Sequence, residues 1–155
     1  MPYTKSLRRF SRQSWEAFVE DLAAHHDHVL MEGVVAGCAL VANADGWATE
    51  DERRRMLGLI RGFEPLAKFG VADVTGYFDE LSIKFTHDPD AAEAEAFRAV
   101  GRLKGRGRQA ELLVETCCAI AAADGGFDAE ERSMARGICE VLELDPARFD
   151  LADAR

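Results

Sequence analysis

The sequence predicts an all-α fold: a single compact multi-helix domain built from two pseudo-symmetric helical hairpins with intervening helices. Apolar residues recur at intervals of three and four along most of the 155 residues, and no useful length alternates with the period of two that is typical of a β-strand. The chain also repeats itself, because segment 42–53 recurs without a gap as 121–132, at an offset of 79 residues. The copies extend over about 29–64 and 108–143, and one domain over 1–155 is expected.

Three helices are expected in the first part of the chain. The first covers about 11–27 and begins behind a serine. The second carries the apolar segment 31–41, which is apolar around most of the cylinder and should therefore be central, and Gly46 ends it. The third begins at Thr49 and is closed by Pro65. The residues expected to face inward are Trp15, Phe18, Val19 and Leu22 in the first helix, Met31, Val34, Val35, Cys38 and Val41 in the second, and Met56, Leu57, Ile60 and Phe63 in the third.

Two further helices are expected between the copies. The second of them begins at Asp88, with Pro89 in the favoured first helical position, and runs to about Leu103. The glycine-spaced basic segment 101–108 follows, and we interpret it as a flexible link with solvated charges rather than as an anion site at the next helix. The inward-facing residues of the first of these helices are Val74, Tyr77, Phe78, Leu81 and Phe85.

The second copy predicts another central helix and its hairpin partner. Asp145 and Pro146 then cap a last short turn, from which Phe149 is expected to fold back onto the body. The inward-facing residues are Leu113, Val114, Cys117, Ile120 and Ala121 in the central helix, and Met134, Ile138, Val141 and Leu142 in its partner.

Composition restricts the function. A formal net charge of −9 disfavours nucleic-acid binding, which needs basic surface, and favours cations or basic partners. No segment is apolar for long enough to span a bilayer and no signal peptide is visible, so a cytoplasmic protein is expected. The cysteines lie in apolar helical patterns, which predicts buried thiols rather than disulfides: Cys38, Cys117, Cys118 and Cys139.

The acids that follow each repeated turn have a purely structural interpretation. Thr49 with Glu52, and Asp128 with Glu131, fit the capping box, in which a cap side chain and the third helical residue satisfy each other's backbone amides. The remaining acids would lie in first turns, where negative charge suits the helix dipole: Glu50, Asp51 and Glu130. Helix capping therefore explains these acids without a ligand.

Helix capping does not explain Asp45 and Asp124. Each lies at the C-terminal end of a predicted helix, where the dipole disfavours negative charge. Oxygen ligands that converge on a tight loop are what a hard cation needs. With Gly46 in the sixth position of an EF-hand loop, Val41 and Ile120 would fill the first position and cannot ligate, so a true EF-hand is rejected. A weaker site, completed by water or by a partner, and a set of structural caps remain as alternatives.

The repeated pattern is an apolar helix, then an Asp-Gly turn, then two or three acids. It reads Ala44-Asp45-Gly46 with Glu50-Asp51-Glu52 in the first copy, and Ala123-Asp124-Gly125 with Glu130-Glu131 in the second. Over nearly the whole chain this pattern resembles the tellurite resistance TerB family. The resemblance implies a helical fold, a role in resistance to tellurium oxyanions and related stress, and an acidic surface that binds a divalent cation such as Ca²⁺. The positions that carry over as metal ligands are Asp45, Asp51, Glu52, Asp124, Glu130 and Glu131, with Asn43 and Asp128 as weaker candidates.

The same resemblance implies partners: a TerC-like membrane protein and TerD-like calcium-binding proteins. It places the protein in the cytoplasm or peripherally at the inner face of the membrane. Two hypotheses follow, a cation-binding stress protein and a metal-free interaction scaffold whose turn acids are helix caps and a docking face. A third and weaker hypothesis is direct thiol chemistry on tellurite at Cys117 and Cys118.

Catalysis has little support in the sequence. No serine or cysteine has a recognisable nucleophile motif, and no glycine loop follows a strand, so no enzyme and no catalytic residue is expected. The histidine cluster is interpreted as a solvated helix end rather than a metal site: His25, His26 and His28. The N-terminal basic residues are expected on a helix packed against the body, with membrane or partner contact as the alternative: Lys5, Arg8, Arg9 and Arg12.

Overall fold

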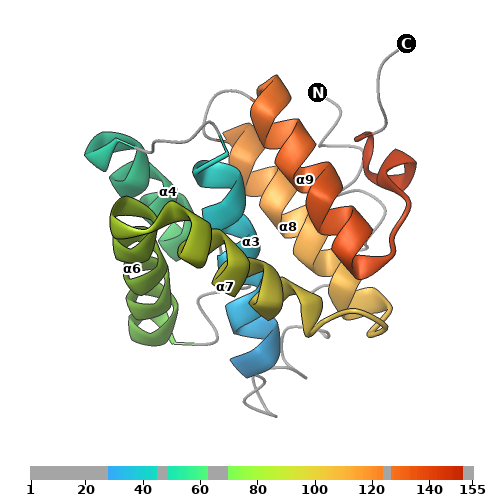
Figure 1. Cartoon of the computed structure of the whole chain (residues 1–155), viewed down its shortest axis with the longest axis horizontal. Coiled ribbons are helices and arrows are strands. Elements are labelled where there is room, and N and C mark those ends of the chain that lie inside the picture. The colour runs from blue at the N-terminus through green and yellow to red at the C-terminus, as the bar shows by residue number, and fades with distance from the viewer. Residues whose placement is uncertain (1–27, 45–48, 63–69, 124–126, 152–155) are drawn as a thin grey trace.

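Six α-helices and one short 3₁₀ helix make up the described part of the chain, and that part contains no strand (Figure 1). The computed structural model describes residues 28–44, 49–62, 70–123 and 127–151. The predicted all-α fold is therefore confirmed. The helix expected over about 11–27 lies outside the described residues, as do Gly46, Phe63 and Pro65.

Helix α3 (His28–Ala42) forms the centre of the molecule, as its apolar sequence predicts. It packs most extensively on α7 (Pro89–Gly101) and α8 (Arg108–Ala123), and also on α6 (Val71–His87). Figure 1 shows α4 and α6 on one side of α3, and α8 and α9 on the other. Neighbours on several sides explain why eleven of its fifteen residues are buried: Leu30, Met31, Gly33, Val34, Val35, Ala36, Gly37, Cys38, Ala39, Leu40 and Val41.

Two glycines let α3 approach its neighbours closely. A Cβ at Gly33 would lie 2.7 Å from Leu103 Cδ1, and a Cβ at Gly37 would lie 2.6 Å from Cys117 Sγ. Both distances are shorter than van der Waals contact, so any larger residue would push the elements apart. The missing side chains at these two positions therefore allow the tight packing of the core.

Helix α4 (Glu50–Gly62) lies at the edge of the body and packs more extensively on α6 than on α3. Met56 and Ile60 are buried, as predicted, and Arg61 Nε donates a hydrogen bond to Thr75 Oγ1 at 3.4 Å. The first predicted hairpin is thus more loosely packed than the second, formed by α8 and α9 (Ala129–Leu142). Spatial pseudo-symmetry between the two hairpins stays a prediction.

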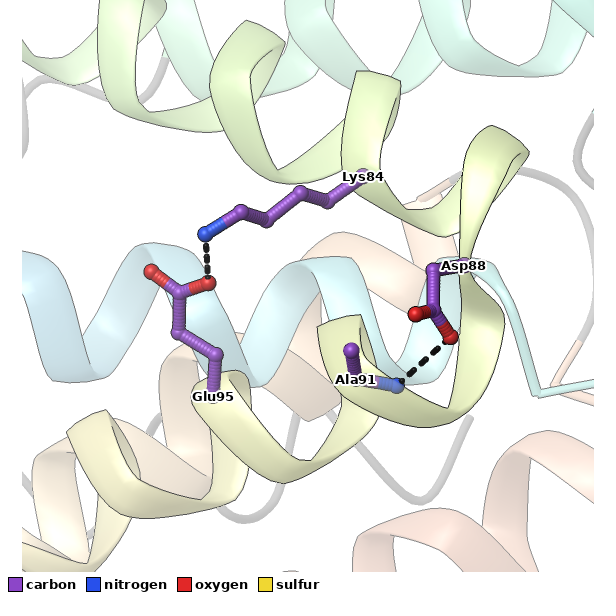
Figure 2. Close-up of polar contacts among 4 residues, drawn as sticks. All are labelled: Lys84, Asp88, Ala91 and Glu95. Carbon is purple, nitrogen blue, oxygen red and sulfur yellow. Dashed lines mark hydrogen bonds and ion pairs between the residues drawn. The ribbon is translucent and has the colours of Figure 1, made fainter.

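One residue both ends α6 and begins α7. The Asp88 N–H donates to Lys84 O at 2.7 Å. Asp88 Oδ1 accepts from the Ala91 N–H at 3.2 Å, as Figure 2 shows. Pro89 follows in the first helical position, so the predicted start of this helix is confirmed. Lys84 and Glu95 form an ion pair across the same corner (Figure 2).

The basic segment after α7 is a defined pair of turns, which differs from the flexible link that we expected. The helix ends at Gly101, and the buried Leu103 anchors the turn that follows. Gly105 and Gly107 adopt positive φ angles of 82° and 57°, which glycine tolerates without strain. The charges here are exposed, but two of them contact acids elsewhere in the fold. Arg102 Nη1 lies 3.3 Å from Glu32 Oε2 in α3, and Lys104 Nζ lies 3.0 Å from Oε1 of Glu143, the residue that follows α9.

The chain after α9 folds back onto the body, as predicted. Asp145 Oδ1 accepts from the Ala147 N–H at 3.0 Å and begins the 3₁₀ helix Pro146–Phe149. Phe149 and Leu151 are buried against the core cluster. This C-terminal segment therefore adds to the body of the domain.

Candidate functional site

The second acidic turn forms the predicted capping box at the start of α9. Asp128 Oδ1 accepts from the Glu131 N–H at 2.8 Å, and Glu131 Oε1 accepts from the Asp128 N–H at 3.2 Å. The box uses one oxygen of each carboxylate and leaves Asp128 Oδ2 outside it. Glu130 is exposed in the first helical turn, where its charge suits the dipole. Three acids thus gather at one helix N-terminus, two of them bonded to each other's backbone.

The first acidic turn is described only in part. Asn43 Nδ2 donates to Ala39 O at 2.8 Å, so this side-chain amide bonds back into α3 while its oxygen is not used in that bond. Asp51 is exposed. Glu50 pairs with Arg54 at 2.9 Å, and both side chains are mostly exposed, which makes the pair a weak surface contact. Nothing is described of the Glu52 side chain.

The two Asp-Gly pairs that motivate a cation site, with Asp45 and Asp124, lie outside the described residues. Within the described ranges, no group of three or more His, Cys, Asp or Glu residues is arranged to hold a metal ion. The predicted ligands Asp128, Glu130 and Glu131 adjoin one another, and nothing described joins them to the first turn. The cation site therefore stays a prediction, whereas the capping role of Asp128 and Glu131 is observed.

The cysteine thiols are buried, as predicted. Cys38 Sγ lies 3.9 Å from Cys117 Sγ, and the hydrogen bond with Cys38, together with burial, raises the pKa of the Cys117 thiol well above its usual value. Burial raises the pKa of Cys118 in the same direction and that of Cys139 to about 12. Protonated, buried thiols are poor nucleophiles, so this arrangement argues against direct thiol chemistry on an oxyanion.

Within the described ranges, the remaining candidates from the sequence form no binding site. His28 and His87 are exposed, the first at the start of α3 and the second in the last turn of α6. Their neighbours His25 and His26, and the N-terminal basic residues, lie outside the described ranges. None of the described helices is both long and apolar enough to cross a membrane.

A groove between α4 and α6 was not anticipated from the sequence. We call it the α4–α6 groove; it has a volume of about 300 Å³ and is lined by Arg53, Arg54, Leu57, Asp79 and Ile83. Within the described part of the chain, Ile83 is the large apolar side chain that stands out as exposed, at 55%. The i, i+4 pairs Arg53/Leu57 and Asp79/Ile83 were visible in the sequence as helix faces. Nothing in the sequence indicated that α4 would lie against α6.

The sequence matches known proteins over most of its length. The family model described as "Tellurite resistance protein TerB" matches residues 31–154. A protein named "Tellurium resistance protein TerB", from Alcaligenes sp, is 28% identical over 99 residues, which cover 64% of this chain and 81% of the relative. No solved structure matches the chain.

Proposed function

The chain belongs to the TerB family of tellurite resistance proteins, and from this premise we propose that it is a non-enzymatic stress-response protein that binds divalent cations through its two acidic turns. The observation that carries the proposal is the duplication of an Asp-Gly turn followed by acids, with the acids of the second copy gathered at the N-terminus of α9.

The donor atoms suit a hard cation. All the proposed ligands present oxygen, which Ca²⁺ and Mg²⁺ prefer, and Ca²⁺ takes six to eight such ligands. In the second turn the capping box leaves Asp128 Oδ2 for a ligand, and Glu130 is exposed beside it. Each turn offers fewer groups than Ca²⁺ takes, so water or a partner would complete the shell. The residues that would hold the ions are Asp45, Asp51 and Glu52, and Asp124, Glu130 and Glu131.

We extend the proposal to partners that the family resemblance implies. The protein would work in the cytoplasm, or at the inner face of the membrane, with a TerC-like membrane protein and TerD-like calcium-binding proteins. A net charge of −9 supports a preference for cations and for basic partner surfaces.

Titration calorimetry with Ca²⁺, Mg²⁺, Mn²⁺ and Zn²⁺ tests the cation proposal. We expect binding of at least one of these ions with a dissociation constant below about 1 mM, in the range of weak calcium modules. The double variant Asp45→Asn, Asp124→Asn should lose this binding, because each change removes a charged ligand and keeps the side-chain shape.

A matched control separates ligation from net charge. Asp73 and Asp90 are first-turn acids of α6 and α7, away from the acidic turns in sequence. The double variant Asp73→Asn, Asp90→Asn changes the net charge equally and should bind the ion as the parent does. No binding by the parent, or equal loss in both double variants, would contradict the proposed site.

The capping box supports a second candidate function, a metal-free scaffold whose turn acids cap helices and form a docking face. Under this alternative the Asp45→Asn, Asp124→Asn variant responds to ions as the parent does, but captures less of the TerC-like partner's cytoplasmic segments. The two candidates therefore predict opposite results in the same calorimetric measurement.

A further inference from the structure

Helix α9 of the second repeat copy holds the C-terminal segment 145–151, whose buried side chains include Phe149 and Leu151. Arg132 Nη2 donates to Asp150 O at 2.6 Å, and Arg136 Nη1 donates to Leu151 O at 3.3 Å. The Leu151 side chain is fully buried and belongs to the core cluster. Two arginines of α9 thus bind backbone carbonyls of a short segment that carries a buried leucine.

Among the residues that the structure describes, no segment is held at the corresponding position on α4. Helices α4 and α9 begin at Glu50 and Ala129, separated by the offset of the sequence repeat, so Arg53 and Arg132 are both the fourth residue of their helices. Arg132 holds the C-terminal segment, whereas the Arg53 guanidinium makes no hydrogen bond or ion pair with the rest of the described structure. Arg53 instead lines the α4–α6 groove.

The chemistry of the groove combines positive charge with an apolar surface. Arg53 and Arg54 contribute guanidinium groups, and the pairing of Arg54 with Glu50 is an exposed contact that a ligand displaces at little cost. Leu57 and Ile83 contribute an aliphatic surface, and Ile83 is left 55% exposed. Asp79 lines the α6 side of the groove and presents a carboxylate there. The two guanidinium groups give this groove local positive charge on a chain whose net charge is −9.

We propose that the α4–α6 groove docks a peptide segment of another protein in which a large aliphatic side chain lies next to an acidic residue. The aliphatic side chain packs on Leu57 and Ile83. A backbone carbonyl of the segment accepts from Arg53 in the way that the Asp150 backbone carbonyl accepts from Arg132, and the carboxylate pairs with the guanidinium groups of Arg53 and Arg54. Charge complementarity selects an acidic segment over a basic one, and the apolar surface selects a peptide over a small inorganic anion. The proposal does not depend on cation binding by the acidic turns.

The test uses a synthetic peptide with the sequence of residues 145–151, which ends in Asp150 and Leu151, the two residues whose backbone carbonyls α9 binds in the chain itself. Titration into the isotope-labelled full chain, followed by NMR, should shift the methyl signals of Leu57 and Ile83. A peptide with alanine in place of its leucine should bind at least about tenfold more weakly, because the buried aliphatic group is lost.

Charge-reversal variants then locate the site. Arg53→Glu should weaken binding by about tenfold or more, since it replaces a donor of a charge-assisted hydrogen bond with a like charge. Arg98→Glu, at an exposed position of α7 outside the groove, changes net charge equally and should leave affinity within about twofold. If Arg53→Glu fails to fold by circular dichroism, the exposed Ile83→Asp variant replaces it and should lose binding likewise.

Three outcomes would overturn the proposal. The first is the absence of shifts at Leu57 and Ile83 at millimolar peptide, or shifts confined to α9 and the C-terminal segment. The second is equal weakening by Arg53→Glu and Arg98→Glu, which would indicate a general charge effect. The third is concentration-dependent self-association of the chain through the groove without peptide, which would make a second copy the occupant.

Discussion

Gly37 and Gly58 occupy helix interiors with opposite surroundings. A Cβ at Gly37 would lie 2.6 Å from Cys117 Sγ and 3.1 Å from Leu113 Cδ2, whereas a Cβ at Gly58 would meet nothing within 4 Å. Glycine is unfavourable in both helices on propensity alone. Its presence at Gly37 therefore has a packing reason, which is absent at Gly58.

Alanine at the two positions should change stability in opposite directions. Gly37→Ala should lower the free energy of unfolding by about 1–3 kcal/mol, because the added methyl group forces α3 and α8 apart. Gly58→Ala should raise it by about 0.5–1 kcal/mol, because only helix propensity changes. Urea unfolding followed by circular dichroism measures both. A neutral Gly37→Ala would mean that α3 and α8 separate without cost.

Because buried thiols keep their protons on folding, the free energy of unfolding is expected to fall at alkaline pH. Burial, with smaller contributions from Asp145 and Glu140, raises the pKa of Cys139 from its ordinary 9.0 to about 12. Above pH 9 the unfolded chain releases a thiol proton that the folded chain keeps. The unfolded state is then favoured, so stability falls as the pH rises from about 9 toward 12.

The variant Cys139→Ala should show a shallower loss over this range. Removal of one such group should reduce the slope by at most about 1.4 kcal/mol per pH unit. The measurement is the free energy of unfolding by urea at several pH values between about 7 and 11, for parent and variant. Parallel pH profiles would show that the Cys139 proton is not retained on folding.

Local side-chain chemistry fixes where the helices begin. Asp88, Asp128 and Asp145 each accept a backbone N–H at the start of a helical segment, and each start was predicted from the sequence. Asx side chains cap helices through contacts within two or three residues, so a sequence alone contains the information. Helix starts are therefore the feature of the secondary structure that the sequence predicts best.

Substitutions inside and outside the capping box of α9 measure how much the box itself stabilises the helix. Asp128→Ala should lower the free energy of unfolding by about 1 kcal/mol, because the Glu131 N–H loses its acceptor. Glu130→Ala, in the same turn but outside the box, should cost no more than its dipole contribution, about 0.3–1 kcal/mol. The double variant Asp128→Ala, Glu131→Ala should cost less than the sum of the two single changes. Additive costs would show that the two bonds stabilise the helix independently of each other.

At the scale of the whole molecule, the sequence predicted the helices better than their arrangement. The all-round apolar α3 was placed at the centre correctly, because only burial on several sides satisfies such a surface. The packing of α4 on α6 was not predicted, since it depends on contacts between helices that no local pattern encodes. Arg53 and Ile83 were therefore unnoticed until the two helices came together.

The candidate functional site also has a part that the sequence predicts and a part that it does not. The Asp128–Glu131 box follows from spacing along the chain and was predicted correctly. The cation site depends on Asp45 and Asp124, and on whether oxygens from separate segments converge, which spacing alone does not determine. Calorimetry on the Asn variants therefore tests whether the acidic turns bind a cation, which the sequence repeat alone does not establish.

The shared cap at Asp88 has a consequence for the lengths of related chains. Asp88 both closes α6 and opens α7, so no further linker residue separates these two helices. One inserted residue in the first turn of α7 would rotate the rest of that helix by roughly 100° and turn its alanine-rich face away from α3. Insertions and deletions among homologues should accordingly avoid this corner and collect in the glycine turns before α8.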